Sequence, residues 1–501
     1  MENLMTFLEA FFMLFTDVNV LLLMLGATAL GVIIGALPGL TATMGIALLT
    51  GLTYNVPLEY TFTILMGVYV GGIYGGSISA ILLNIPGTAS AAATALDGHQ
   101  LALQGKAETA IKVTRLASIV GTMIGVLALA MLAPPLTKIA LKFTSPEYFM
   151  LAFFGVLICG SVAADDLSIK GWIAGLMGIL LAFVRLDDLE SIPRFTFENF
   201  NLFSGIAVIP AMIGFYAIPE VIKAFAKTDD LEVTEAKDTD DTKINVFTTV
   251  FSKMRVIVQS ALIGLGLGAL PGVGEDVAAW VAYDTAKRTS KEKEKYGTGS
   301  YEGAIAPEVG NNAAIGGAII PLLTLGVPGS PPAAVLLGAL TLHGIRPGPM
   351  INIESPGFIS EMAALIMLGV IALWVVGMIL AKPMAKILKI PIVYLMPVVA
   401  ALSVIGAYAI NLSKFDLIMV FIFGVLGYFL SKMCYSPAPI VLGLILGNMI
   451  DVTFRRTLIT SNGSFLPFVT RPIALVFFIF IAITIVSQVR ATIKRNEPIE
   501  E

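Results

Sequence analysis

The chain alternates long apolar stretches with short polar ones along almost its whole length. Segments of about 20 mainly apolar residues recur, which is the length that a helix needs to cross a bilayer. The pattern therefore predicts an all-α, polytopic membrane protein with about 12 transmembrane segments. The stretches that predict these segments are Asn19–Leu37, Thr61–Leu83, Ala117–Ala133, Tyr148–Ala164, Trp172–Val184, Phe203–Ile222, Val256–Leu270, Ala304–Leu325, Phe358–Leu380, Val393–Ile410, Leu417–Leu430 and Ile473–Ile485.

Other apolar stretches are too short to cross a bilayer unbroken, and we expect them to form half-helices or re-entrant arms. They are Thr41–Tyr54, Val277–Ala286 and Ala333–Leu342, and Pro437–Ile450 is expected to be a further broken span. Met1–Asp17 has no basic start and no clear cleavage site, so we expect a retained amphipathic or membrane-entering helix.

Helix-breaking residues occur in two matched pairs inside this apolar sequence. Gly35–Gly39 reads Gly-Ala-Leu-Pro-Gly and recurs unchanged at Gly268–Gly272, and Pro86-Gly87-Thr88 is matched by Pro328-Gly329-Ser330. Proline removes a helical hydrogen bond and glycine permits left-handed backbone, so each site predicts a broken helix. Discontinuous helices at corresponding places of two halves indicate a transporter binding site.

The matched breaks divide the chain into two repeats. We predict a first membrane repeat at 1–225 and a second at 247–489, joined by a charged cytoplasmic linker at 226–246 and followed by a polar tail at 490–501. Residues 1–105 contain no Lys or Arg, whereas the loop at Lys287–Lys295 is strongly basic. Because cations mark cytoplasmic loops, this swap of sides predicts inverted repeats.

Composition narrows the class of protein further. The chain is 57% hydrophobic and 13% charged, about half the charge of a soluble protein. A net charge of −4 makes nucleic acid an unsuitable partner. Cys159 and Cys434 are too few for a disulfide framework or a metal site.

The broken helices predict the chemistry of the site. A half-helix start carries partial positive charge and binds anions, and Ser and Thr hydroxyls can donate to a carboxylate. We therefore expect an anionic substrate to be held without buried Lys or Arg; packing kinks alone are the alternative. The candidate substrate-binding residues are Pro38, Gly39, Thr41, Thr43, Pro86, Gly87, Thr88, Ser90, Pro271, Gly272, Asn311, Asn312, Pro328, Gly329 and Ser330.

Acidic and amide residues near the breaks are candidates for ion coupling. Glu275 and Asp276 follow the second Leu-Pro-Gly and either hold Na⁺ or a proton or cap their own helix. Asn311 and Asn312 contact a cation or substrate, or hydrogen bond between helices. For Asp97 and His99 a surface role is expected.

These motifs together resemble a known family. Gly35-Ala-Leu-Pro-Gly39 and its second copy, Gly71-Gly-Ile-Tyr-Gly-Gly76, Asn84-Ile-Pro-Gly-Thr88, Leu96-Asp-Gly-His-Gln100 and Gly326-Val-Pro-Gly-Ser330 are similar to the large membrane subunit of tripartite tricarboxylate transporters, the TctA type. The resemblance implies a multi-pass permease of the bacterial inner membrane. It implies a small TctB-like membrane subunit, a TctC-like periplasmic binding protein, and import of carboxylates such as citrate with Na⁺ or H⁺.

The leading hypothesis is therefore secondary active import of an organic carboxylate. We expect no organic cofactor. Na⁺ is a candidate coupling ion, and the sequence does not identify its ligands. An ion channel is an alternative, but it would show a polar pore-lining stripe. An intramembrane enzyme is another, but His99 and His343 have no nucleophile pattern nearby. No nucleotide-binding motif is present, which excludes ATP-driven transport by this chain alone.

Overall fold

The computed structural model describes residues 2–162, 168–226 and 244–495, and these are almost entirely helical. The first half holds α1 (Glu2–Thr16), α2 (Val18–Ala36), α3 (Ala42–Leu52), α4 (Leu58–Leu83), α5 (Ala91–Leu103), α6 (Ala107–Ala140), α7 (Ser145–Val162), α8 (Ser168–Ala182), β1 (Arg185–Leu186), β2 (Pro193–Arg194), η1 (Phe200–Leu202) and α9 (Val208–Ala226). The predicted linker falls largely on residues 227–243, outside the described residues.

The second half begins with α10 (Val246–Phe251) and runs to the end of the described chain. It continues with α11 (Met254–Gly268), α12 (Gly274–Thr289), η2 (Lys293–Lys295), α13 (Tyr301–Leu325), α14 (Pro331–Leu342), α15 (Ile351–Glu354), α16 (Phe358–Ile387), α17 (Ile392–Asn411), α18 (Lys414–Lys432), α19 (Pro437–Thr460), α20 (Leu466–Thr470) and α21 (Pro472–Arg495).

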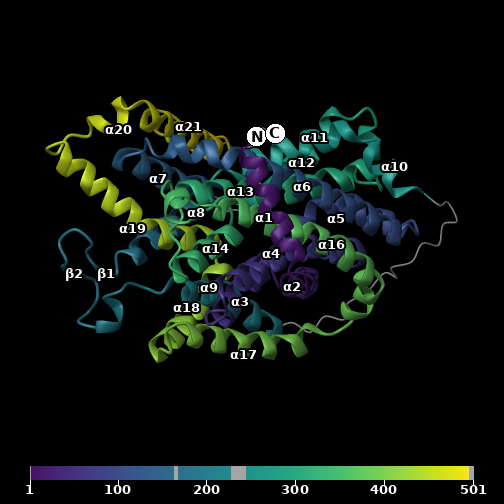
Figure 1. The fold of residues 1–501 in the computed structure, drawn as a ribbon, viewed down its shortest axis with the longest axis horizontal. Coiled ribbons are helices and arrows are strands. Elements are labelled where there is room, and N and C mark those ends of the chain that lie inside the picture. Colours follow the sequence, from purple (N-terminus) through teal and green to yellow (C-terminus); the bar gives the residue numbers. More distant parts are fainter. Residues whose placement is uncertain (1, 163–167, 227–243, 496–501) are drawn as a thin grey trace.

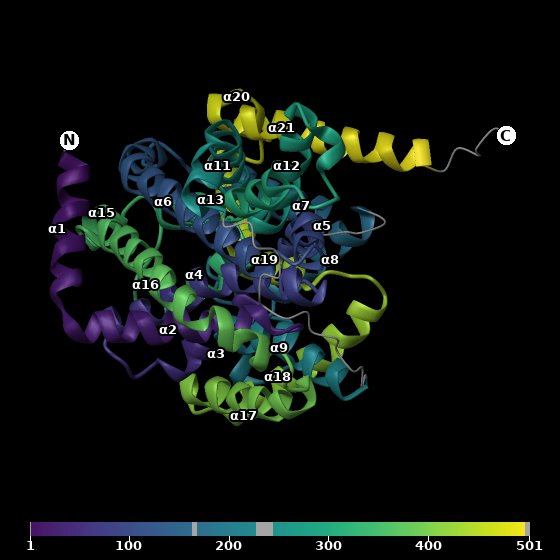
Figure 2. The same cartoon turned by 90° about the vertical axis from the view of Figure 1, so that its right-hand side faces the viewer.

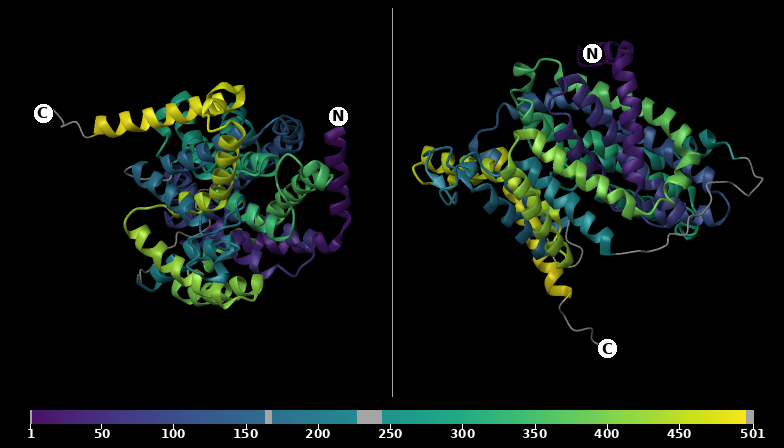
Figure 3. Two further views of the ribbon diagram at one scale, coloured as in Figure 1. Left: turned by 90° about the vertical axis from the view of Figure 1, so that its left-hand side faces the viewer. Right: turned by 90° about the horizontal axis from the view of Figure 1, so that it is seen from below.

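The peripheral helices frame the molecule. In Figure 1, α17 runs along one side while α20 and α21 lie along the opposite side. Figure 2 shows α1 standing at one edge and the end of α21 reaching the other edge, so the two ends of the chain lie on opposite sides. The two further views in Figure 3 agree with this placement. The broken helices lie between these outer elements.

Eight described helices are long and apolar enough to cross a membrane, fewer than the expected number. The difference arises where the apolar part of a helix is short, as in α7, α8, α11 and α21. It also arises in α13, where Glu308, Asn311 and Asn312 interrupt the apolar sequence. The eight are α2, α4, α6, α9, α16, α17, α18 and α19.

One sequence-based boundary was wrong. Pro437–Ile450 is not a broken span, because α19 continues unbroken to Thr460 and its Asp451 and Arg455 form ion pairs there. Helix α6 begins with a pair of its own, in which Lys112 lies 2.7 Å from Glu108 one turn earlier. Helix α21 reaches Arg495, and residues 496–501 of the predicted tail lie outside the described chain.

Helix α5 and a strand hairpin lie outside the apolar stretches that predict membrane segments. The small-residue run after Pro86-Gly87 forms α5, a helix of 13 residues. A two-stranded antiparallel hairpin joins α8 to α9, with Arg185 paired to Arg194 and Leu186 to Pro193. Strands of two residues carry no periodicity that a sequence pattern can reveal.

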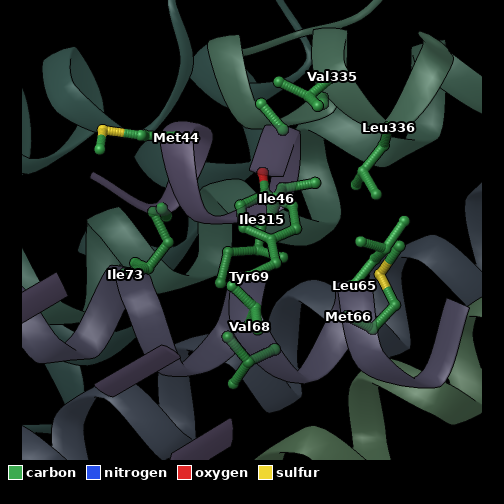
Figure 4. Close-up of a cluster of buried hydrophobic side chains, with 14 of the residues drawn as sticks. Met44, Ile46, Leu65, Met66, Val68, Tyr69, Ile73, Ile315, Val335 and Leu336 are labelled. Atoms are coloured by element: carbon green, nitrogen blue, oxygen red, sulfur yellow. The ribbon is translucent and has the colours of Figure 1, made fainter. Parts of the chain in front are cut away.

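The centre of the molecule is built on α4 and α13, which are almost completely buried. Helix α2 packs on α4, α11 packs on α13, and α6 crosses α13. Figure 4 shows the core cluster in which Met44 and Ile46 of α3, Tyr69 of α4, Ile315 of α13 and residues of α14 lie together. The core therefore joins the two halves of the chain.

Close packing at glycine fixes both pairs of breaks in the same way. A Cβ added to Gly87 would lie 2.0 Å from the carbonyl oxygen of Gly35. A Cβ added to Gly329 would lie 2.0 Å from the carbonyl oxygen of Gly268. Only glycine lets the backbones approach this closely, so the two breaks of each half touch one another.

Candidate functional site

The first Leu-Pro-Gly turns the chain between α2 and α3. Gly39 has a φ of +83°, which favours glycine. Thr41 then caps α3, because its hydroxyl oxygen accepts the N–H of Met44 at 3.2 Å. Pro38 stands at the turn itself, where its lack of an N–H breaks no helical hydrogen bond.

The break between α4 and α5 is held by hydroxyl groups. Asn84 ends α4 in a left-handed conformation. The Thr88 hydroxyl oxygen accepts the N–H of Ala91 at 3.3 Å and lies 3.0 Å from the Ser90 hydroxyl oxygen. Both hydroxyls are buried at the start of α5.

The breaks of the second half use the same local devices. Gly272 and Gly274 have φ values of +75° and +62° between α11 and α12, and Gly326 ends α13 with a φ of +72°. Ser330 caps α14, because its hydroxyl oxygen accepts the N–H of Ala333 at 3.3 Å. Pro328 and Gly329 form the turn between these two helices.

Three helix starts meet at one place. The N–H of Ser90, at the start of α5, donates to the carboxylate of Asp276 in the first turn of α12 at 2.9 Å. A Cβ added to Gly274 would lie 2.8 Å from the Cβ of Ser330, which places the starts of α12 and α14 in contact. The starts of α5, α12 and α14 thus bring breaks of both halves together.

Tyr69 of α4 ties this junction to the core. Its hydroxyl hydrogen bonds to the carboxylate of Glu275 and lies 3.2 Å from the Ser330 hydroxyl oxygen. The start of α3 is placed differently, because Ala42 packs against Gly72 of α4. Among the described residues, no hydrogen bond joins Thr41 or Thr43 to the junction of the three helix starts.

The two acidic residues of α12 have different surroundings. Glu275 is only 2% exposed and is held by Tyr69, whereas Asp276 is exposed. Asp276 caps a helix, but the helix is α5 of the other half rather than its own. An accessible carboxylate and a buried one therefore lie side by side where positive helix ends meet.

Asn311 and Asn312 of α13 also differ in their hydrogen-bond partners. The Asn312 side chain donates to the carbonyl of Glu308 at 2.9 Å and accepts from the Thr122 hydroxyl at 3.3 Å, so it links α13 to α6. Asn311 is 1% exposed, and neither its amide nitrogen nor its amide oxygen has a partner among the described residues. A buried amide without partners is costly, and such a group is suited to a ligand.

Glu308, also on α13, is one of the acidic residues near the breaks, and the sequence assigned it no specific role. It is fully buried and accepts hydrogen bonds from the hydroxyls of Ser77, Thr94 and Ser118. Its position inside an apolar span was the available signal, because ionisable groups in membrane helices are expensive. The three donors lie far away in the sequence and could not be assigned from it.

The expected surface role of Asp97 was wrong. Asp97 is fully buried, and one of its oxygens accepts the N–H groups of Gly297, Gly299 and Ser300 at 2.9, 3.0 and 2.7 Å. The aspartate thus fixes the loop that begins α13. His99 is partly buried, with a ring nitrogen 2.9 Å from the carbonyl oxygen of Ile81.

A cavity of about 540 Å³ adjoins the break after α13. It lies among α9, α14, α17 and α19, and Gly326 forms part of its wall. Its polar lining comes from Thr341, Arg346, Asn411 and Asn448. The volume is in the range of sites for small molecules.

Comparison with known proteins decides the family. The model of the tripartite tricarboxylate transporter TctA family matches residues 21–442, which include all four breaks. The chain belongs to the TctA family. Because this is a family of transporters, the chain is a multi-pass transporter component and not an enzyme, and membership implies a tripartite system with TctB and TctC partners.

Two relatives come from Agrobacterium vitis. The chain is 36% identical over 463 residues to an uncharacterised 52.8 kDa protein of the TAR-I ttuC' 3' region, covering 92% of this chain and 91% of the relative. It is 38% identical over 208 residues to an uncharacterised protein of the TAR-II ttuC' 3' region, covering 42% of this chain and 86% of the relative. No solved structure matches the chain.

Proposed function

We propose that this TctA-family protein imports an organic carboxylate, a tri- or dicarboxylate such as citrate, across the bacterial cytoplasmic membrane. A TctC-like periplasmic binding protein delivers the substrate, a TctB-like subunit completes the membrane unit, and a Na⁺ or H⁺ gradient drives transport. The observation that carries this proposal is the meeting of three helix starts from both halves of the chain. Helix α13 adds the buried amide of Asn311, which has no partner among the described residues.

The junction offers an anion the contacts that it needs. Helix starts present N–H groups and partial positive charge, and Ser90 and Ser330 add hydroxyl donors. The Asn311 amide is a further donor, since nothing else among the described residues occupies it. A carboxylate held in this way needs no buried Lys or Arg.

The acidic pair supplies a reason for coupling to a cation. A substrate carboxylate about 4 Å from an ionised Glu275 or Asp276 would be repelled by about 4 kcal/mol in surroundings with an effective dielectric constant near 20. A bound Na⁺ or proton cancels that repulsion. Substrate and cation therefore bind together more readily than the substrate alone, which is the requirement for symport.

The cavity lined by Arg346 supports a route to the site. It is hollowed beside Gly326, which ends α13 four residues before Ser330. The Arg346 guanidinium is exposed and can attract a carboxylate before it reaches the junction. We assign this cavity to substrate access.

The two halves are proposed to be inverted repeats. Each has four helices with a break after the first and another after the third, and the third helix of the four is the longest. The matched glycine contacts and the swap of basic loops between halves both favour this arrangement.

Uptake in reconstituted vesicles tests the proposed function. The full chain, its TctB-like subunit and its binding protein are placed in proteoliposomes, and labelled di- and tricarboxylates are added with and without Na⁺ and pH gradients. We expect accumulation of a carboxylate above its outside concentration. Carboxylate that only equilibrates would indicate a channel, and no entry under any gradient would contradict the proposal.

A further inference from the structure

Glu308 is a carboxylate buried at the interface of the two halves. It lies on α13 of the second half, and its three hydroxyl partners come from α4, α5 and α6 of the first half. No ion pair involves Glu308 among the described residues, so no cation balances its charge. An unbalanced carboxylate at this depth is costly unless it can bind a proton.

We propose that Glu308 binds and releases the coupling proton, and that the transported cation is therefore H⁺. This inference rests on the proposed function of carboxylate uptake. It names a residue apart from Glu275 and Asp276, which lie at the junction of the helix starts.

The hydroxyl partners accommodate both protonation states. The Thr94 hydroxyl lies 2.6 Å from one carboxylate oxygen, which also accepts from Ser77, and the Ser118 hydroxyl lies 2.7 Å from the other. A hydroxyl can donate or accept by rotating its hydrogen. The carboxylate is thus fully hydrogen bonded when ionised, and a neutral acid can donate to one of the same hydroxyls.

The Ser118 hydroxyl needs a second acceptor if it is to stop donating to Glu308 when the acid becomes neutral, and one lies within reach. The Ser118 hydroxyl oxygen also lies 2.9 Å from the carbonyl oxygen of Thr114, one turn earlier on α6. One hydrogen cannot serve both acceptors fully. When Glu308 takes up a proton, the Ser118 hydroxyl turns to Thr114 and its oxygen accepts from the acid, with no movement of the backbone.

Other titratable groups on the surrounding helices do not neutralise Glu308. On α4, Tyr74 has a buried hydroxyl that finds no partner in the described part of the chain, and it lies within electrostatic range of Glu308 and of Arg115 on α6. On α5, Asp97 is engaged by the 297–300 loop and by Tyr283 of α12. Glu275 and Asp276 of α12 have partners in the junction. On α11, Gly264 packs on Gly310, close to Glu308 in the sequence, and Arg255 lies more than two turns before Gly264.

Two helices connect Glu308 with the junction of helix starts. At the start of α5, the N–H of Ser90 donates to Asp276. One turn later on the same helix, the Thr94 hydroxyl donates to Glu308. On α4, the Tyr69 hydroxyl donates to Glu275. Two turns later on the same helix, the Ser77 hydroxyl donates to Glu308. An ionised Glu308 accepts from all three hydroxyls, whereas a protonated one releases a donor, so proton binding changes the hydrogen bonds that hold α4, α5 and α6 on α13.

Proton-driven uptake and carboxylate exchange separate this role from a merely structural one. Proteoliposomes containing the full chain and its partners are compared for wild type, Glu308→Gln and Glu108→Gln, the last being a control at a partly exposed acid of α6 that pairs with Lys112. We expect Glu308→Gln to keep exchange of labelled for unlabelled carboxylate within about twofold. We expect it to lose accumulation driven by a pH gradient by about tenfold or more.

Ser118→Ala keeps the proposal testable should the glutamine variant fold poorly. Removing this hydroxyl takes one donor from the ionised acid, so we expect half-maximal proton-driven uptake to move to higher pH. Proton-driven accumulation retained by Glu308→Gln, loss of exchange in a folded Glu308→Gln, or wild-type accumulation driven by Na⁺ alone would each overturn the assignment. Wild type that neither exchanges nor accumulates any carboxylate would instead remove the proposed function itself.

Discussion

The two sets of broken helices share a backbone arrangement but not a chemistry. In the first half the breaks carry hydroxyl groups, namely Thr41, Thr43, Thr88 and Ser90. In the second half the corresponding region carries Glu275 and Asp276, and α13 adds Glu308 and Asn311. The backbone contacts at Gly87 and Gly329 are nevertheless the same.

This difference shows how the work of a transporter can be divided within one chain. Hydrogen bonds from the first half end on carboxylates of the second, as with Ser90 on Asp276 and Thr94 on Glu308. Neither half contains all the groups of the proposed site. The function therefore depends on how the halves pack, and the following predictions test that dependence from the largest expected effect to the smallest.

Alanine at the matched glycines tests the shared backbone. Gly87→Ala and Gly329→Ala each force a Cβ to 2.0 Å from a carbonyl oxygen, at a cost of about 3 kcal/mol or more because backbone must move. We expect both variants to lose folded, transport-competent protein, measured as monodisperse yield and carboxylate uptake. Gly26→Ala and Gly266→Ala are matched controls on α2 and α11, where nothing lies within 4 Å. Variants that behave like these controls would contradict the packing argument.

Neutralising the acidic pair tests the chemical difference between the halves. In Glu275→Gln with Asp276→Asn the substrate meets no fixed negative charge at the junction. We therefore expect the dependence of uptake on Na⁺ concentration or pH to change, while proton coupling through Glu308 remains. The measurement is uptake rate against Na⁺ concentration and pH. Asp284→Asn, an exposed acid on the same helix, is the control. An unchanged cation dependence would leave the pair with a capping role.

The neighbouring asparagines separate a ligand contact from a structural one. The Asn311 amide has no hydrogen-bond partner among the described residues, so its removal breaks no such bond. Asn311→Ala is therefore expected to raise the KM for the carboxylate about tenfold with little change in melting temperature. Asn312→Ala removes contacts to Glu308 and Thr122, so it is expected to lower the melting temperature. Thermal unfolding in detergent and uptake kinetics give both values. The reverse pattern would assign substrate contact to Asn312.

The smallest effect is expected at the hairpin, away from the broken helices. The Arg194 guanidinium holds the pKa of Asp187 well below its usual range, and Arg455 also binds it. Because the folded pKa lies below the unfolded value of about 3.9, this stabilisation is present above that pH and is lost as pH falls through the folded pKa.

Asp187→Asn is therefore expected to lower the melting temperature by a few degrees at pH 7. The gap to wild type should narrow as the pH falls below about 4. Thermal unfolding at several pH values measures both effects, with Glu292→Gln in an exposed pair as the control. A gap that stays constant with pH would mean that the charge of Asp187 is not what stabilises the hairpin.

The sequence by itself determined the features that depend on local pattern. Apolar length predicted the helical membrane protein, and Gly and Pro predicted the breaks, because backbone preferences act within a few residues. Thr41 and Ser330 were recognisable as helix caps for the same reason. The repeated motifs also indicated the family, which the TctA match confirmed.

Only the tertiary structure decided which polar groups meet. Glu308 finds Ser77, Thr94 and Ser118 at sequence separations of 231, 214 and 190 residues, and no periodicity encodes such pairings. The burial of Asp97, the capping of α5 by Asp276 and the isolation of Asn311 are of the same kind. The sequence shows where a polar residue in an apolar span carries a free-energy cost of burial. Which partner offsets that cost depends on which helices pack beside it.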